Sequence, residues 1–267
     1  MRRTANAPAS SCPDQRRMTA DLAQDFGICH CAARRICTRP ASLLGIAAMN
    51  IPNPPAAFIF DLDGTLADTE PAWIRAKSEV AQSEGACVSD PLLDSFTGRR
   101  ILDFLEHVLP DHAPDCRAAL VREVARRARL YLPEVTRPMP GAIAFVRHLQ
   151  GQGARLAVCS SSAEDLIEQA LGILGIADAF GPRVSGFGMP RSKPDPAPYL
   201  ETLRQLNLRA EHVIAFEDSP AGITSATAAG IATIGLGAHA QPMAAHCVAV
   251  IPDLGQAYDL VVWARPD

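Results

Sequence analysis

Residues 56–66 have the sequence Ala-Ala-Phe-Ile-Phe-Asp-Leu-Asp-Gly-Thr-Leu, an apolar run that stops at a carboxylate. A proline-rich lead-in at residues 52–55 precedes it. Continuous apolar runs bounded by turn-forming residues are typical of strands buried on both faces of a parallel sheet. The stretch therefore predicts a buried strand that ends in two aspartates, Asp61 and Asp63.

Similar apolar runs recur along the rest of the chain, and helical patterns separate most of them. The apolar runs lie at residues 155–159, 212–216, 231–236 and 248–251, and the helical patterns at 140–151, 163–173, 196–208 and 219–229. Parallel strands need crossover connections, and these helices supply them. The alternation predicts an α/β fold with a doubly wound, mostly parallel, Rossmann-like sheet.

Residues 69–138 interrupt this alternation, because they contain no expected strand. Helical periodicity appears at about 70–84, 99–109 and 115–131, with an apolar stripe at Leu102, Leu105, Val108 and Leu109. We expect a helical insert at 69–138 within a core formed by residues 49–68 and 139–267.

The first 48 residues carry seven Arg, three Asp, no Lys and no Glu. Three interpretations remain open. The composition favours a disordered N-terminal extension ahead of a start at Met49. An Arg-rich targeting peptide is the second interpretation. The third is a metal-binding patch of Cys29, His30, Cys31 and Cys37, although the C-x-C spacing matches zinc sites poorly.

The net charge of -4 gives no basic footprint for nucleic acid, so we expect no nucleic-acid partner. We also expect no membrane span, since no apolar run reaches about 18 residues. Outside the first 48 residues, Cys87, Cys116, Cys159 and Cys247 are widely spaced. They predict buried thiols in a reducing compartment, which favours a cytoplasmic protein.

Polar side chains follow the predicted strands, where ligands bind in an open α/β sheet. The carboxylates among them would repel one another without a cation, and oxygen ligands suit Mg²⁺. Lys193 is one of two lysines in a chain with 25 Lys and Arg residues. A compact ammonium beside hydroxyls suits a phosphoryl group, although a surface lysine before a turn is the alternative. The residues concerned are Asp61, Asp63, Ser160, Ser161, Lys193, Glu217 and Asp218.

This pattern resembles the haloacid dehalogenase superfamily. The matching motifs are the Asp-Leu-Asp-Gly-Thr-Leu run at 61–66, Ser160 after an apolar strand, Lys193-Pro194, and the Glu-Asp-Ser-Pro-Ala-Gly run at 217–222. The resemblance implies that Asp61 is a nucleophile that forms an aspartyl-phosphate, and that Asp63 is the general acid/base.

The same resemblance assigns the remaining polar residues. Ser160, Ser161 and Lys193 are expected to bind phosphate. Asp61, Asp63 through its backbone carbonyl, and Asp218 are expected to hold Mg²⁺, and Glu217 to support the metal directly or through water.

The insert follows the first motif, as the helical cap of this superfamily does, and such caps favour small substrates. We therefore expect a phosphatase of a small phosphorylated metabolite, such as a sugar phosphate, phosphosugar acid or phosphoglycolate-like molecule. Asp63 disfavours a dehalogenase. A phosphomutase of the β-phosphoglucomutase type is the alternative, although Trp73 stands where that branch has a histidine. Phosphonatase activity is disfavoured because Lys77, early in the first helix, is the only lysine of the insert.

A non-catalytic phospholigand-binding protein is a third possibility, and the intact set of Asp61, Asp63, Lys193 and Asp218 argues against it. Specificity is expected from the insert, at Glu70, Trp73, Arg99 and Arg100. The two arginines would bind a second anionic group of the substrate, unless they are solvated charges at a helix start. A monomer or weak dimer is expected, since the insert already shields the site.

Overall fold

The computed structural model describes residues 55–96 and 100–260. Strand β1 (Ala57–Phe60) is fully buried and lies at the centre of a six-stranded sheet. It pairs in parallel with β4 (Arg155–Ser160) and β6 (Val213–Glu217). The strand order is β5-β4-β1-β6-β7-β8, and every pairing in this sheet is parallel. The predicted doubly wound α/β fold is confirmed.

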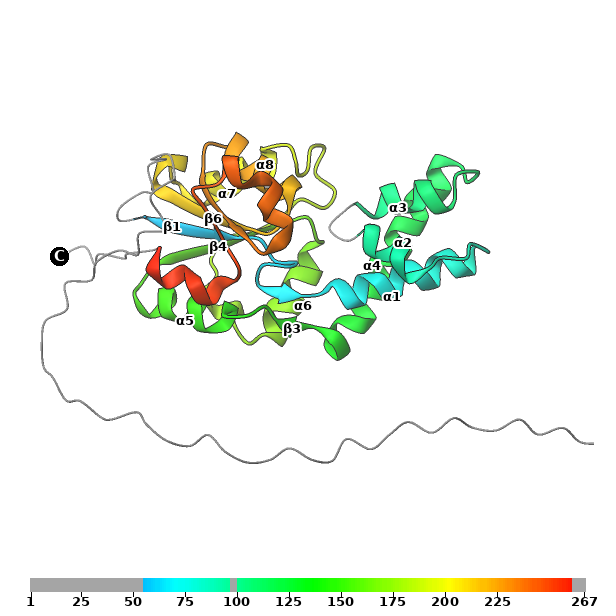
Figure 1. Ribbon diagram of the computed structural model, residues 1–267, viewed down its shortest axis with the longest axis horizontal. Helices are drawn as coiled ribbons and strands as arrows, with labels where there is room; N and C mark the ends of the chain where they lie inside the picture. Colours follow the sequence, from blue (N-terminus) through cyan, green and yellow to red (C-terminus); the bar gives the residue numbers. More distant parts are fainter. Residues whose placement is uncertain (1–54, 97–99, 261–267) are drawn as a thin grey trace, which may run out of the picture. The chain divides into compact units, whose positions relative to one another are not determined.

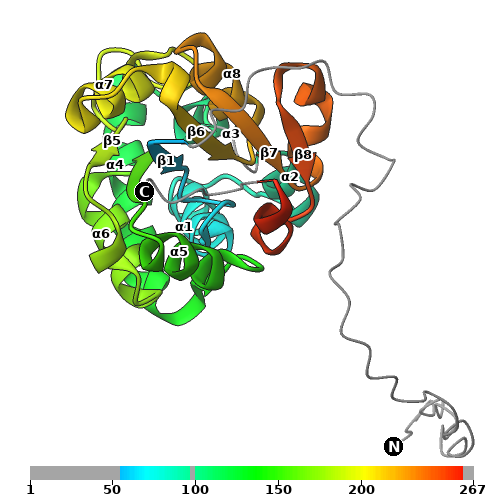
Figure 2. The same cartoon turned by 90° about the vertical axis from the view of Figure 1, so that its left-hand side faces the viewer.

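Side chains of β1 alternate between two apolar layers, because successive residues of a strand point to opposite faces. Phe58 and Phe60 pack in one layer with α5 (Ala142–Gly151) and α6 (Glu164–Ile173). Ala57 and Ile59 pack in the other layer with α7 (Ala197–Leu206) and α8 (Pro220–Ala228). Figure 1 shows α7 and α8 on one side of the sheet and α5 on the other, and Figure 2 shows the same layers after a quarter turn.

The outer strands of the sheet are β5 (Arg183–Ser185) at one edge and β8 (Ala249–Ile251) at the other, with β7 (Ala232–Leu236) between β6 and β8. Short helical turns lie in the connections of the sheet. The 3₁₀ turns are η2 (Ala177–Ala179), η3 (Ala210–His212), η4 (Ala238–His246) and η5 (Leu254–Asp259). Strand β5 was not predicted, because three residues are too few to show a period.

The described residues of the helical insert form four helices with an apolar cluster of their own. They are α1 (Glu70–Ser83), α2 (Asp90–Ser95), α3 (Ile101–Val108) and α4 (Pro114–Val135). An antiparallel ribbon of β2 (Ala67–Asp68) and β3 (Arg137–Pro138) lies at both ends of the insert. The expectation of no strand within residues 69–138 is therefore wrong for β3, whose two residues give no periodic signal.

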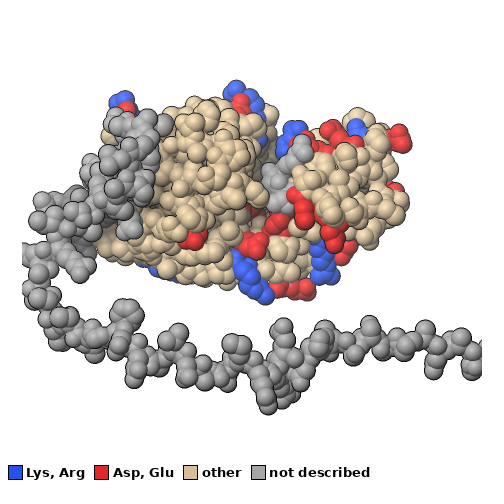
Figure 3. All heavy atoms as spheres, viewed as in Figure 1, with Lys and Arg blue, Asp and Glu red and all other residues tan. Residues whose placement is uncertain are grey.

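The surface of these residues carries mixed charge. Acidic and basic side chains are interspersed on the face turned to the viewer in Figure 3. The charges are also mixed in the arginine-rich stretch of α4, where Glu123 pairs with both Arg126 and Arg127. Of the helices that the structure describes, none is long and apolar enough to cross a membrane.

The four described cysteines are free thiols, but they divide into two kinds. Cys159 and Cys247 are buried, as predicted. Cys87 and Cys116 are exposed, so the prediction of four buried thiols is wrong for these two. Cys87 lies in the loop between α1 and α2, and Cys116 lies in the first turn of α4, both in the small insert, where less of the chain can be covered. The patch predicted around Cys29 and Cys31 lies outside the described residues.

Candidate active site

The loops that follow β1, β4 and β6 meet at one edge of the sheet, below a cavity of about 1280 Å³. The predicted site residues that line this cavity are Asp61, Asp63, Glu70, Trp73, Arg100, Ser161, Lys193 and Asp218. Ser160 and Glu217 have no exposed surface and lie behind this lining. Arg99 lies outside the described residues. The fold therefore brings together, at one edge of the sheet, the residues that were predicted to act in catalysis, phosphate binding and metal binding.

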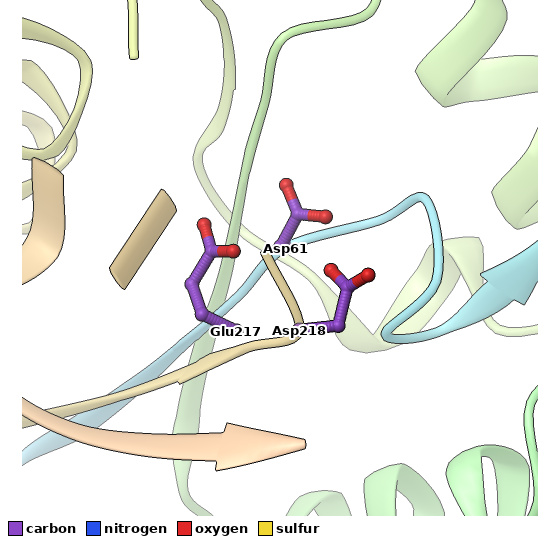
Figure 4. A group of neighbouring side chains, drawn as sticks. All are labelled: Asp61, Glu217 and Asp218. Atoms are coloured by element: carbon purple, nitrogen blue, oxygen red, sulfur yellow. The ribbon is translucent and has the colours of Figure 1, made fainter. Parts of the chain in front are cut away.

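Three carboxylates of this edge, Asp61, Glu217 and Asp218, have oxygen atoms within 4.8 Å of one another. Figure 4 shows Asp61 on one segment of the chain, with Glu217 and Asp218 adjacent on another. Glu217 is the last residue of β6, and Asp61 and Asp218 directly follow β1 and β6. Burial raises the pKa of Asp61 well above its ordinary value, although Lys193 opposes the shift. Burial and the neighbouring Glu217 raise the pKa of Asp218 to about 7. Crowded carboxylates with raised pKa values are a site that a cation would stabilise.

Lys193 reaches this group from the loop before α7. Its Nζ lies 2.6 Å from Asp61 Oδ1, 2.6 Å from Glu217 Oε1 and 2.8 Å from the carbonyl oxygen of Cys159. These three acceptors match the three N–H donors of an ammonium group. Burial alone would lower the pKa of Lys193, but the two carboxylates raise it well above its ordinary value. The lysine is therefore a fixed positive charge beside Asp61.

Glu217 lies at the end of β6 and is completely buried. Its Oε1 also accepts a hydrogen bond of 2.6 Å from the Tyr199 hydroxyl, and its Oε2 one of 3.3 Å from Ser219 Oγ. Helix α8 packs directly on this carboxylate, because a Cβ atom at Gly222 would collide with it. These contacts make Glu217 an anchor for Lys193, and its role toward a metal stays a prediction.

The Asp63 carboxylate is held by four donors. Its Oδ2 accepts hydrogen bonds from Ser162 Oγ at 2.8 Å and from Ser160 Oγ at 3.2 Å. Its Oδ1 accepts a short hydrogen bond from Thr69 Oγ1 and a long one, 3.4 Å, from Trp73 Nε1. These donors hold the Asp63 carboxylate apart from the group of Asp61, Glu217 and Asp218. Asp63 lines the cavity, so a molecule bound there could contact it.

Sequence reasoning missed Ser162, Thr69 and Tyr199 as site residues. A signal for Ser162 did exist. Residues two apart on an extended chain point to the same side, so Ser162 should accompany Ser160. Ser161 points differently, since it is exposed and lines the cavity, and its phosphate-binding role stays a prediction.

The turn after β1 explains why Gly64 follows Asp63. Gly64 has a φ angle of +82°, which favours glycine, and a Cβ atom there would lie 2.8 Å from Asp218 Cγ. The next residue, Thr65, donates a hydrogen bond of 3.4 Å to Asp218 Oδ1. The turn after β1 therefore packs against the carboxylate of Asp218, the residue that follows β6.

Charged residues of the insert form pairs around the cavity. Lys77, which is buried, has its Nζ 3.2 Å from Glu70 Oε1. Arg100 Nη2 lies 2.5 Å from Asp103 Oδ1. Both pairs border the cavity, and the predicted roles of Glu70 and Arg100 in specificity stay predictions.

The sequence matches the haloacid dehalogenase-like hydrolase family over residues 58–236. The chain belongs to this family. It is 33% identical over 178 residues to a validoxylamine A 7'-phosphate phosphatase of Streptomyces hygroscopicus, covering 67% of this chain and 84% of the relative. It is 32% identical over 191 residues to hexitol phosphatase B of Escherichia coli, covering 70% and 85%. A phosphoglycolate phosphatase of Cereibacter sphaeroides is 31% identical, with 65% and 81% covered.

Solved structures agree with this assignment. CbbY from Rhodobacter sphaeroides, solved in complex with phosphate, superposes with a TM-score of 0.66 at 25% identity, covering 76% of this chain and 96% of that one. A β-phosphoglucomutase from Clostridium difficile has a TM-score of 0.67 at 22% identity, covering 78% and 95%, which supports the fold.

Proposed function

We propose that this haloacid dehalogenase-type phosphatase hydrolyses phosphomonoesters of small metabolites through an aspartyl-phosphate on Asp61, with Mg²⁺ as cofactor. The observation that carries the proposal is the position of Asp61, within a group of three carboxylates and 2.6 Å from the Lys193 ammonium. The named activities of the relatives favour sugar phosphates, sugar-alcohol phosphates or phosphoglycolate as substrates.

In the first step, a carboxylate oxygen of Asp61 attacks phosphorus. A bond forms between that oxygen and phosphorus while the bond from phosphorus to the leaving oxygen breaks. Asp63, in its protonated form, gives its proton to the leaving oxygen and releases an alcohol. The four donors around Asp63 hold the carboxyl group in place for this transfer.

In the second step, water hydrolyses the aspartyl-phosphate. Asp63, now ionised, takes a proton from the water as its oxygen attacks phosphorus. The bond between phosphorus and Asp61 breaks, which restores the carboxylate and releases inorganic phosphate. Lys193 is proposed to balance the charge of the phosphoryl group, with Ser160 and Ser161 nearby.

The donor set fits Mg²⁺, which prefers oxygen ligands and accepts one or two carboxylates together with substrate phosphate. Asp61, Asp218 and the backbone carbonyl of Asp63 would hold the ion, with Glu217 supporting it. Bound there, Mg²⁺ would neutralise negative charge on the transferring group. The raised pKa of Asp218 is the physical reason for a cation at this position.

Trp73 favours hydrolysis over mutase activity. Its indole N–H lies 3.4 Å from Asp63 Oδ1, and an indole nitrogen can donate a hydrogen bond but cannot accept a proton. The side chain therefore holds Asp63 and offers no second acid/base group on the insert.

The test is phosphate release from a panel of sugar phosphates, sugar-alcohol phosphates and phospho-acids, with Mg²⁺ and with EDTA. We expect Mg²⁺-dependent release that disappears in Asp61→Asn. Asp178→Asn is the matched control, since Asp178 is an exposed carboxylate paired with Arg147 away from the cavity. Full activity in Asp61→Asn would contradict the proposal, as would equal activity in EDTA.

A further inference from the structure

One exposed aromatic side chain belongs to the cavity and has no part in the proposed chemistry. Phe187 lies in the loop between β5 and α7, and 45% of its surface is exposed. Six large apolar side chains of the described residues are exposed to a similar degree: Leu130, Ile143, Ile173, Phe187, Leu200 and Tyr258. Of these six, Phe187 alone lines the cavity. Single exposed apolar residues are ordinary on a surface, but one on a cavity wall can contact a ligand.

The loop that carries Phe187 is fixed to the catalytic edge. The Gly186 amide donates a hydrogen bond of 2.7 Å to the carbonyl oxygen of Ser160. Ser185 Oγ donates one of 2.7 Å to the carbonyl oxygen of Ser162 and accepts one of 3.2 Å from the Phe187 amide. Ser160 and Ser162 are two of the four residues that donate hydrogen bonds to the Asp63 carboxylate. The aromatic ring is thus carried by backbone tied to the proposed acid/base group.

The residues next to Phe187 in the loop offer its ring no side chain to pack against. Its neighbours, Gly186 and Gly188, have no side chains, and Gly188 has a φ angle of +78°. Phe187 shares the cavity wall with Met189 of the same loop and with Leu102 and Val121 of the insert. The cavity lining therefore combines the charged residues of the sheet edge, where the phosphate would bind, with apolar residues of this loop and of the insert.

An apolar wall with an aromatic face suits a ring better than a short acid. The face of an aromatic ring is negative and attracts the polarised C–H bonds on the flat side of a saturated ring. The volume of about 1280 Å³ is large beside the roughly 300–1,000 Å³ of drug-sized sites. A two-carbon phospho-acid would leave Phe187 uncovered and most of this volume filled with water.

We propose that Phe187 is a specificity residue that stacks on the apolar face of a ring in the leaving group. The preferred substrates are then phosphomonoesters of cyclic sugars or cyclitols, rather than open-chain polyol phosphates or two-carbon phospho-acids. This inference rests on the proposed function, because it names the substrate class of the same site.

The test compares kcat/KM of the wild type and Phe187→Ala on a pyranose phosphate, a cyclitol phosphate, a sorbitol phosphate and phosphoglycolate. For the best ring substrate we expect a loss of roughly tenfold, mostly through a higher KM, as for other stacked rings. For sorbitol phosphate and phosphoglycolate, kcat/KM should change by less than about twofold. Phe187→Tyr keeps an aromatic face and should keep the ring preference. Leu200→Ala is the matched control, since Leu200 is equally exposed but lies outside the cavity.

Two results would overturn the inference. One is an equal loss on all four substrates in Phe187→Ala, which would indicate a structural role for the loop. The other is that the wild type prefers an open-chain or two-carbon substrate and that Phe187→Ala leaves kcat/KM unchanged.

A binding experiment keeps the two proposals separate. Calorimetric titration of the pyranose and cyclitol phosphates into Asp61→Asn, with and without Phe187→Ala, needs no turnover. Weaker binding of either ligand to the double variant than to Asp61→Asn supports stacking. Equal binding of both ligands to the two variants overturns the inference, as does the absence of binding of both ligands to Asp61→Asn. Absence of phosphate release from every substrate, with such binding intact, would overturn the proposed function alone.

Discussion

Lys193 and Glu217 form an ion pair with 2.6 Å between Nζ and Oε1, and neither side chain has more than 5% of its surface exposed. The pair links the proposed nucleophile to the end of β6, because the same ammonium contacts Asp61. A buried charge that loses its partner is costly, so both the stability and the activity of the protein should depend on this contact.

Glu217→Gln tests this dependence. The amide keeps the shape of the side chain but removes one of the two negative charges beside Lys193, since Asp61 stays in contact with the ammonium. We therefore expect a loss of about 1.5–3 kcal/mol in the free energy of unfolding. Urea unfolding measures it. Glu211→Gln is the control, since Glu211 is an exposed carboxylate paired with Arg209. Equal stability of the two variants would show that the buried pair is dispensable.

Gly222→Ala should disturb the same carboxylate from the other side. A Cβ atom at this position would collide with Glu217, so we expect a loss of about 1–3 kcal/mol in the free energy of unfolding and reduced activity. Gly172→Ala is the matched control, because it lies in α6 with nothing within 4 Å of the added atom. The control should be neutral or slightly stabilising, as an alanine in a helix usually is. A Gly222→Ala variant as stable as the control would contradict the packing argument.

Substitutions of the neighbouring serines Ser161 and Ser162 should have different effects. Ser162→Ala removes the 2.8 Å hydrogen bond to Asp63 Oδ2, so we expect kcat to fall by roughly tenfold with little change in KM. Ser161→Ala should act mainly on KM, because Ser161 faces the cavity and makes no contact with Asp63 in the described structure. Steady-state kinetics on one substrate measures both. The same pattern of change in the two variants would argue against this division.

The stabilisation by Mg²⁺ should depend on pH. The pKa of Asp218 is about 7 in the folded protein and about 3.9 in an unfolded chain. Its protonated form therefore stabilises the metal-free fold at low pH, and this stability is lost as the pH rises from about 4 to about 7. Mg²⁺ binds the ionised form, so the rise in Tm on adding Mg²⁺ should be larger at about pH 8 than at about pH 5.5. Calorimetry measures the difference, which Asp218→Asn should reduce, and a rise of equal size at both pH values would contradict the assignment.

The thiols should separate into reactive and unreactive groups. Burial raises the pKa of Cys159 to about 12 and that of Cys247 to about 11, while Cys87 and Cys116 are exposed. Only thiolates are alkylated, so iodoacetamide at about pH 8 should label Cys87 and Cys116 before Cys159 and Cys247. Peptide mass spectrometry measures the labelling, and denatured protein, in which these four of the eight cysteines should all be labelled, is the control. Labelling of Cys159 as fast as Cys87 would refute the burial.

The central sheet could be predicted because its strands are buried on both faces and produce continuous apolar runs. Strand β1 and its neighbours β4 and β6 were found this way, together with the helices that cross between them. Strands β2, β3 and β5 have two or three residues and no pattern of their own, so only their tertiary pairing defines them.

The candidate site shows the same limit. Asp61 and Asp63 follow a strand, which makes them visible in the sequence. Tyr199 is not visible, because an aromatic residue on the inner face of a helix predicts only core packing. Its hydroxyl reaches Glu217 because the topology packs α7 against β4 and α8, which flank the end of β6, and no local pattern contains that information.

The ribbon of β2 and β3 has a consequence for how the gene could be altered. Ala67 faces Pro138 and Asp68 faces Arg137, so the chain leaves the sheet layer and returns to it at adjacent points. A short hairpin turn could bridge this gap without moving either end. The segment between these two strands could be transplanted between relatives, which would alter what enters the cavity. Residues equivalent to Thr69 and Trp73 would have to be kept, because both donate hydrogen bonds to Asp63.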